Sequence, residues 1–143
     1  MASTVYTNFC RNLAIARHNF SSDTLKTLLH SSVPSETNID SWIARSDITN
    51  EITGTGYTAG GVAQALTFPA VDTTNNRQSI TLTNLSPGWS SSTFSAVGAT
   101  IYKNSGTSTT DYLIEFVDFG GTFTCTAGTF TITYTSDLLI NRV

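Results

Sequence analysis

The chain has 143 residues, the length of one domain with a single modest core. Charged residues make up only 12% of it, the net charge is -3, and the seven Lys and Arg residues are scattered. Nucleic-acid binding requires clustered basic side chains, so this pattern excludes a large nucleic-acid interface. With no run of about 18 apolar residues, the sequence predicts no membrane span. The first 20 residues lack the basic start and long apolar stretch of a secretory signal, so we expect none there.

The N-terminal segment, residues 1–20, is predicted to be helical. Between residues 4 and 17, Val5, Phe9 and Leu13 share one face at helical spacing. A helix this short is marginal alone in water, so its apolar face needs a covering surface. A β-sandwich closes its own core without a helix, so we expect a sister subunit or a larger assembly to supply part of that surface. These three side chains are therefore a predicted assembly interface.

Residues 23–143 are predicted to form an antiparallel, jelly-roll-like β-sandwich. Threonine supplies 26 residues, and its β-branched side chain suits strands. Residues 23–32 are predicted to form a strand, and residues 38–48 a helical turn that buries Trp42 and Ile43. Beyond it, short alternating runs are separated by Gly-, Asn- and Ser-rich turns, as in sandwiches and barrels. The runs are GVAQALTF, QSITLTNL, TFSAVGATIYK, DYLIEFVDF and GTFTITYTS.

Three of these runs predict which side chains are buried together. In each, side chains that suit the core recur at every second residue, and in the last run threonines alternate with them. The side chains expected to share a face are Val62, Gln64, Leu66 and Phe68 in the first run, Val97, Ala99 and Ile101 in the third, and Phe130, Ile132 and Tyr134 in the last.

The stretch NEITGTGYTAGG, residues 50–61, contains a match to the dinucleotide-binding fingerprint from Gly54 to Ala59. That fingerprint binds a pyrophosphate only where it leaves a buried strand and opens a helix. Here the preceding residues are polar, a two-residue alternation follows, and Pro69 would break a helix. We therefore predict no nucleotide binding and interpret the glycines as a structural turn that passes close to another backbone. The glycines of this turn are Gly54, Gly56, Gly60 and Gly61.

The sequence contains no constellation typical of an active site. His18 and His30 are not at metal-ligand spacing, and no G-x-S-x-G elbow presents a nucleophilic serine. We therefore expect no catalytic residues, no metal and no cofactor, and predict that the protein is not an enzyme. Cys10 and Cys125 also lack metal spacing. Their pattern favours two small buried thiols and leaves a disulfide between them open.

The order of these pieces resembles a family of small structural proteins of tailed phages. The likeness spans nearly the whole chain and is carried by NEITGTGYTAGG, GWSSSTFSAVGATIYK, FVDFGG and GTFTITYTSDLLI. Members of that family look like virion proteins, some of them capsid decoration (cement) proteins. The resemblance implies a homotrimeric β-sandwich that binds the phage major capsid protein on the outer face of the head. It also implies a virion location, with assembly in the cytoplasm of the bacterial host.

The aromatic residues support an alternative interpretation. Trp89 lies in the turn-rich stretch SPGWSSS, where an exposed ring could stack on a sugar or anchor a partner, although closing the core is the favoured role. Tyr57 and Tyr102 are further candidates for such contacts. The alternative function is a tail-associated β-sandwich adaptor or a glycan-binding module.

Overall fold

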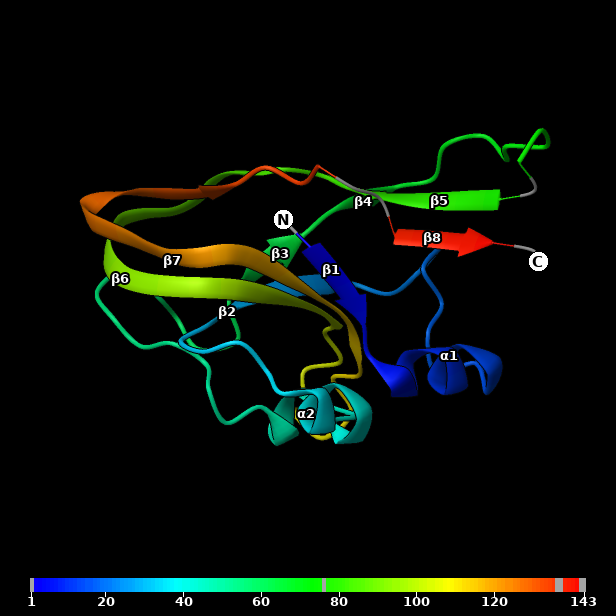
Figure 1. The fold of residues 1–143 in the computed structure, drawn as a ribbon, viewed down its shortest axis with the longest axis horizontal. Coiled ribbons are helices and arrows are strands. Elements are labelled where there is room, and N and C mark those ends of the chain that lie inside the picture. Colours follow the sequence, from blue (N-terminus) through cyan, green and yellow to red (C-terminus); the bar gives the residue numbers. More distant parts are fainter. Residues whose placement is uncertain (1, 76, 136–137, 142–143) are drawn as a thin grey trace.

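The computed structural model describes residues 2–75, 77–135 and 138–141. Two antiparallel sheets lie over one another, with strand orders β1-β7-β6-β2-β3 and β4-β5-β8 (Figure 1). The predicted class, mainly β with antiparallel sheets and little helix, is confirmed. In chain order the elements are β1 (Ala2–Val5), α1 (Thr7–Ala14), β2 (Leu25–His30), α2 (Glu36–Ser41), a 3-10 turn (Arg45–Asp47), β3 (Val62–Gln64), β4 (Leu66–Thr67), β5 (Arg77–Leu82), β6 (Leu85–Lys103), β7 (Leu113–Ile132) and β8 (Leu138–Asn141).

One long two-stranded ribbon forms most of both sheets. Its first strand is β5 followed by β6, its second is β7 followed by β8, and the two run antiparallel. Figure 1 shows the ribbon folding back at one end, so that the start of β6 and the end of β7 lie in the layer of β4, β5 and β8, over the rest of the five-stranded sheet. Near this fold, Ser91 and Ala127 adopt φ of 50° and 47°, and the pairing of β6 with β7 shifts register. Register shifts of this kind are β-bulges, which bend a pair of strands, so they explain why the ribbon folds back at this end.

The two lateral sides of the sandwich differ. On one side the chain passes from sheet to sheet: β3 pairs with β2, and β4 begins two residues after β3 ends and pairs with β5. On the other side β1 pairs with β7 only at residues 115–118. Among the described residues no strand pairs with the outer edge of β7 from Phe119 to Ile132. We call this edge the open side of the sandwich.

Both faces of the five-stranded sheet are covered. Leu28 and Leu29 follow one another in β2, point to opposite faces and are both fully buried. Leu29 packs between the two sheets with Trp89 and Phe94, whereas Leu28 packs with Ile39 of α2 on the other face. The sheet to which the glycine turn is attached is therefore packed on both faces.

The N-terminal helix is shorter than predicted and packs on its own chain. Residues 2–5 form β1 instead, because they pair with β7, and α1 covers only residues 7–14. Phe9 is 3% exposed and lies in the core between the sheets, with Val5 and Leu13 packed against the same cluster. Its own sandwich therefore buries Phe9, so this residue does not need the cover that a sister subunit or a larger assembly is expected to supply in part. A role of this segment in assembly stays a prediction.

The predicted alternation in the last run is confirmed. Ile132 is buried, Phe130 and Tyr134 are half-buried, and the threonines between them are exposed. The short helical segment is also confirmed in outline: α2 ends at Ser41, and Trp42 is 7% exposed, although Ile43 is only half-buried.

Two predictions of buried faces are wrong. Phe68 is 52% exposed, because the chain changes sheets after Gln64 and the alternation does not continue through β4. Val97 is only half-buried, because a register shift between Ala96 and Gly98 reverses the alternation at that point in β6.

Candidate functional site

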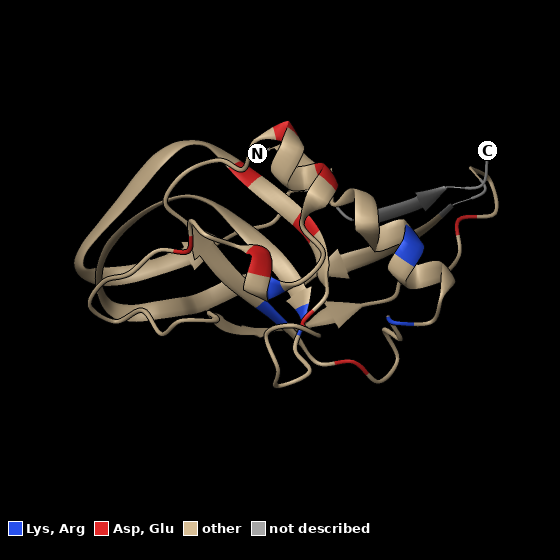
Figure 2. Ribbon diagram, turned by 90° about the horizontal axis from the view of Figure 1, so that it is seen from below, with Lys and Arg blue, Asp and Glu red and all other residues tan. Residues whose placement is uncertain are grey.

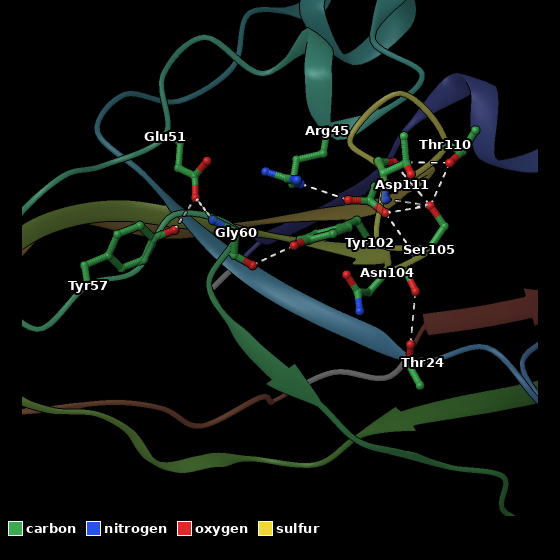
Figure 3. A network of polar contacts seen from close by, with 11 residues as sticks. Thr24, Arg45, Glu51, Tyr57, Gly60, Tyr102, Asn104, Ser105, Thr110 and Asp111 are labelled. Carbon is green, nitrogen blue, oxygen red and sulfur yellow. Dashed lines mark hydrogen bonds and ion pairs between the residues drawn. The ribbon is translucent and has the colours of Figure 1, made fainter.

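The glycine turn is fastened to the five-stranded sheet by polar side chains (Figure 3). Glu51 accepts hydrogen bonds at Oε1 from the Tyr57 hydroxyl, at 2.8 Å, and from the Gly60 backbone N–H. The Tyr57 hydroxyl in turn accepts one from the backbone N–H of Leu29 in β2, at 3.1 Å. From β6, the Tyr102 hydroxyl donates to the Gly60 carbonyl at 2.6 Å. The turn is therefore tied to two neighbouring strands.

An ion pair between half-buried Arg45 and buried Asp111 continues this network. Asp111 is 1% exposed, and its Oδ2 lies 3.0 Å from Nε of Arg45. Its Oδ1 accepts hydrogen bonds from the backbone N–H and the hydroxyl of Ser105, at 2.7 and 2.9 Å. The Arg45 guanidinium also lies over the Tyr102 ring, 5.8 Å from its centroid. Both carboxylate oxygens of Asp111 are thus engaged in holding loops together, an arrangement that suits a structural role rather than that of a general base.

Backbone geometry explains the glycines of the turn. Gly61 has φ +68°, and a Cβ built there would lie 1.8 Å from the carbonyl oxygen of Thr27 in β2. Gly56 has φ +77°, and a Cβ there would lie 2.9 Å from the Cα of Ser92 in β6. Neighbouring strands of the same chain therefore occupy the space beside these two glycines. No helix follows the turn, which leads into β3.

A second polar cluster lies around His30, which is fully buried. The Asn50 amide nitrogen donates to the Ser32 carbonyl, so its Oδ1 accepts from Nδ1–H of His30, at 2.8 Å. His30 Nε2 then accepts from the Thr100 hydroxyl at 2.7 Å, and that hydroxyl accepts from Tyr6 at 2.8 Å. This order of donors fits a neutral imidazole. Burial lowers the pKa of His30 to about 4, partly opposed by the hydrogen bond to Asn50.

His18 lies in a different cluster, where its ring contacts those of Phe9 and Phe20, which also contact each other. It is 5% exposed, and within the described part of the chain neither ring nitrogen has a hydrogen-bond partner. Burial lowers the pKa of His18 to about 4. The two histidines form no common site, and the described residues contain no group of three or more His, Cys, Asp or Glu side chains able to hold a metal.

The structure places the three candidate partner-contact aromatics in or against the core. Trp89 is 3% exposed and packs with Phe94 and Phe130, and Tyr102 is 1% exposed. Tyr57 is half-buried, and its hydroxyl is already engaged. Trp89 turns inward because it lies in β6 rather than in a loop. Trp89 and Tyr102 are therefore not presented to a partner.

Both cysteines are free, Cys10 exposed and Cys125 half-buried. The expectation of two buried thiols is therefore wrong for Cys10, which lies on the solvent face of α1, and Cys125 is buried only in part. The disulfide that the sequence left open is not formed in this structure.

Two surface features were missed in the sequence. The first is an absence of charge, because no Lys, Arg, Asp or Glu occurs in residues 78–102 or 119–136. The bent end of the ribbon therefore has neither positive nor negative side chains (Figure 2). The second is an apolar pocket of about 270 Å³ at the open side. Its lining residues are Phe119, Phe123, Phe130, Thr131, Ile132 and Thr133. The spacing of charged residues in the sequence could have revealed the first feature, whereas the second requires the fold of the ribbon.

Comparisons with protein-family models, with curated proteins and with solved structures found no match to this chain. The helices within the described ranges are all too short or too polar to cross a bilayer.

Proposed function

We propose that this protein is a structural component of a tailed-phage virion. In this proposal it is a capsid decoration protein that binds the major capsid protein on the outer face of the head as a homotrimer. The observation that carries the proposal is the uncharged bent end of the ribbon, whose exposed side chains are mostly hydroxyls. We call these residues the hydroxyl surface. They are Ser90, Ser91, Thr93, Ser95, Thr122, Thr124, Thr126 and Thr129.

A surface of this kind suits docking onto a large protein shell. Serine and threonine lose less side-chain entropy on binding than Lys, Arg or Glu, and carry no charge to desolvate. Contacts made without ion pairs also resist changes in salt. Each contact is weak, but three copies joined in one trimer would bind together with avidity.

The interior of the protein also supports a structural role. The segment NEITGTGYTAGG, which carries much of the resemblance to phage structural proteins, forms the turn that Glu51 and Tyr102 tie to the sheet. These side chains stabilise the sandwich and present no reactive group in a cleft. The alternative, a glycan-binding module, is less well supported, because Trp89 and Tyr102 are buried and therefore cannot stack on a sugar.

Cosedimentation with empty heads assembled from the major capsid protein of the same genome tests this proposal. We expect saturable binding that changes little between low and high salt. Thr126→Lys places a charge on the hydroxyl surface and is expected to weaken binding by about tenfold or more. Thr37→Lys makes the same change at another exposed threonine, in α2, so it is the matched control and should bind like the wild type. Absence of cosedimentation, or equal binding by both variants, would refute the proposal.

A further inference from the structure

The open side of the sandwich leaves a strand edge without a partner. β1 covers β7 only up to Asp118, and beyond it the described residues supply no strand along the outer edge of β7. An unpaired edge presents backbone N–H and C=O groups that can pair with another chain. Proteins protect such edges with lysines, prolines or bulges; between Phe119 and Ile132, β7 has no Lys or Pro, and its pairing with β6 shifts register.

The same edge carries an exposed phenylalanine beside an apolar pocket. Phe123 is 51% exposed, and its ring lies 6.1 Å from that of Phe119. The pocket between them and Phe130 has a volume of about 270 Å³. Engineered cavities of about 150 Å³ already hold benzene, so the pocket has room for a phenyl ring. The edge therefore offers both an aromatic side chain and a place to bury one.

The absence of charged side chains along this edge indicates an uncharged partner. No charged side chain occurs from Phe119 to Ser136, so a charged peptide or polymer would lose its hydration without gaining an ion pair. A second copy of the same chain brings a neutral edge, an exposed Phe123 and the same pocket. In a closed ring such as a trimer, the exposed Phe123 of each copy can lie at the pocket of the next copy.

We propose that the open side is the surface through which copies of this chain associate, with Phe123 of one copy buried at the pocket of another. The proposed surface is separate from the N-terminal helix, whose Phe9 lies in its own core. This inference rests on the self-association in the proposed function but not on head binding. It therefore concerns the free protein, and head binding can succeed or fail separately.

Sedimentation equilibrium of the free protein across a range of concentrations tests the inference. The wild type is expected to have the mass of more than one chain, and Phe123→Asp is expected to weaken association by about tenfold or more. Phe68→Asp is the matched control, because Phe68 is 52% exposed but lies outside the open side, and it should associate like the wild type. Far-UV circular dichroism checks that each variant is folded.

Thr131→Lys provides a second variant on the other part of the same edge, at an exposed position that lines the pocket. Thr131→Lys should also weaken association, and it tests the role of the open side even if Phe123→Asp fails to fold. A wild type that stays monomeric at all concentrations would overturn the inference. So would oligomers that are unaffected by either folded open-side variant.

Discussion

Gly61→Ala should be among the most damaging single-methyl changes in this protein. At φ +68° an alanine is strained by about 1–2 kcal/mol. Its Cβ would also lie 1.8 Å from the carbonyl oxygen of Thr27, which is backbone and cannot rotate away. Relief requires β3 to move from β2, where it is paired through three residues. Losing two or three hydrogen bonds at about 1 kcal/mol each brings the expected total to about 3–5 kcal/mol.

Gly106→Ala is the control, because Gly106 has φ +86° but nothing within 4 Å of a built Cβ. It should cost only the conformational strain of about 1–2 kcal/mol. Urea unfolding monitored by circular dichroism gives both free energies of unfolding by linear extrapolation. Equal losses for the two variants would show that the turn does not press against β2, and would refute the interpretation of this segment as a structural turn.

Other consequences of the structure are equally testable. Ile132→Ala should lower the free energy of unfolding by about 2–5 kcal/mol, because Ile132 is 3% exposed. Thr131→Ala, at an exposed position, should lower it by less than about 0.5 kcal/mol. Similar losses for the two variants would contradict the assignment of Ile132 to the buried face and Thr131 to the exposed face. Phe9→Asp should unfold the isolated chain by circular dichroism, because it buries a charge in the core; a folded variant impaired only in assembly would contradict this. The lowered pKa of His30 implies stability that is complete above pH 6.5 and falls as the pH drops toward 4, by about 3 kcal/mol at 1.36 kcal/mol per pKa unit. His30→Gln should flatten that decline in unfolding experiments at several pH values, leaving the contribution of His18, which has the same sign.

The sequence predicts this fold where local pattern determines burial. The alternation around Ile132 survives because one face of β7 packs in the core there and the other is exposed, although the pairing with β6 shifts register opposite it. The structural turn at residues 54–61 is also predictable from the sequence. Polar residues precede it and an alternating pattern of apolar residues follows it, which does not fit the strand and helix that flank a nucleotide-binding loop. In both cases neighbours along the chain are sufficient to decide the outcome.

The remaining features depend on contacts between distant residues. Val5 has helical spacing with Phe9, but it becomes a strand residue because β1 pairs with β7 more than 100 residues away. A register shift at Val97 changes which alternate residues of β6 point into the core, and the residue types there give no sign of it. The hydrogen bond between Tyr102 and Gly60 joins positions 42 residues apart. The open side exists only because the ribbon folds back, so its pocket could not be inferred from the sequence.

The central claim is that this protein binds the outside of a phage head through its hydroxyl surface. Electron cryomicroscopy of empty heads, reconstructed with and without the added protein, tests it most directly. We expect extra density on the outer face of the shell. The sandwich should fit this density with the bent end of the β6–β7 ribbon, around Thr126, against the major capsid protein. Identical reconstructions with and without the protein, or density fitted with that end facing solvent, would contradict the claim.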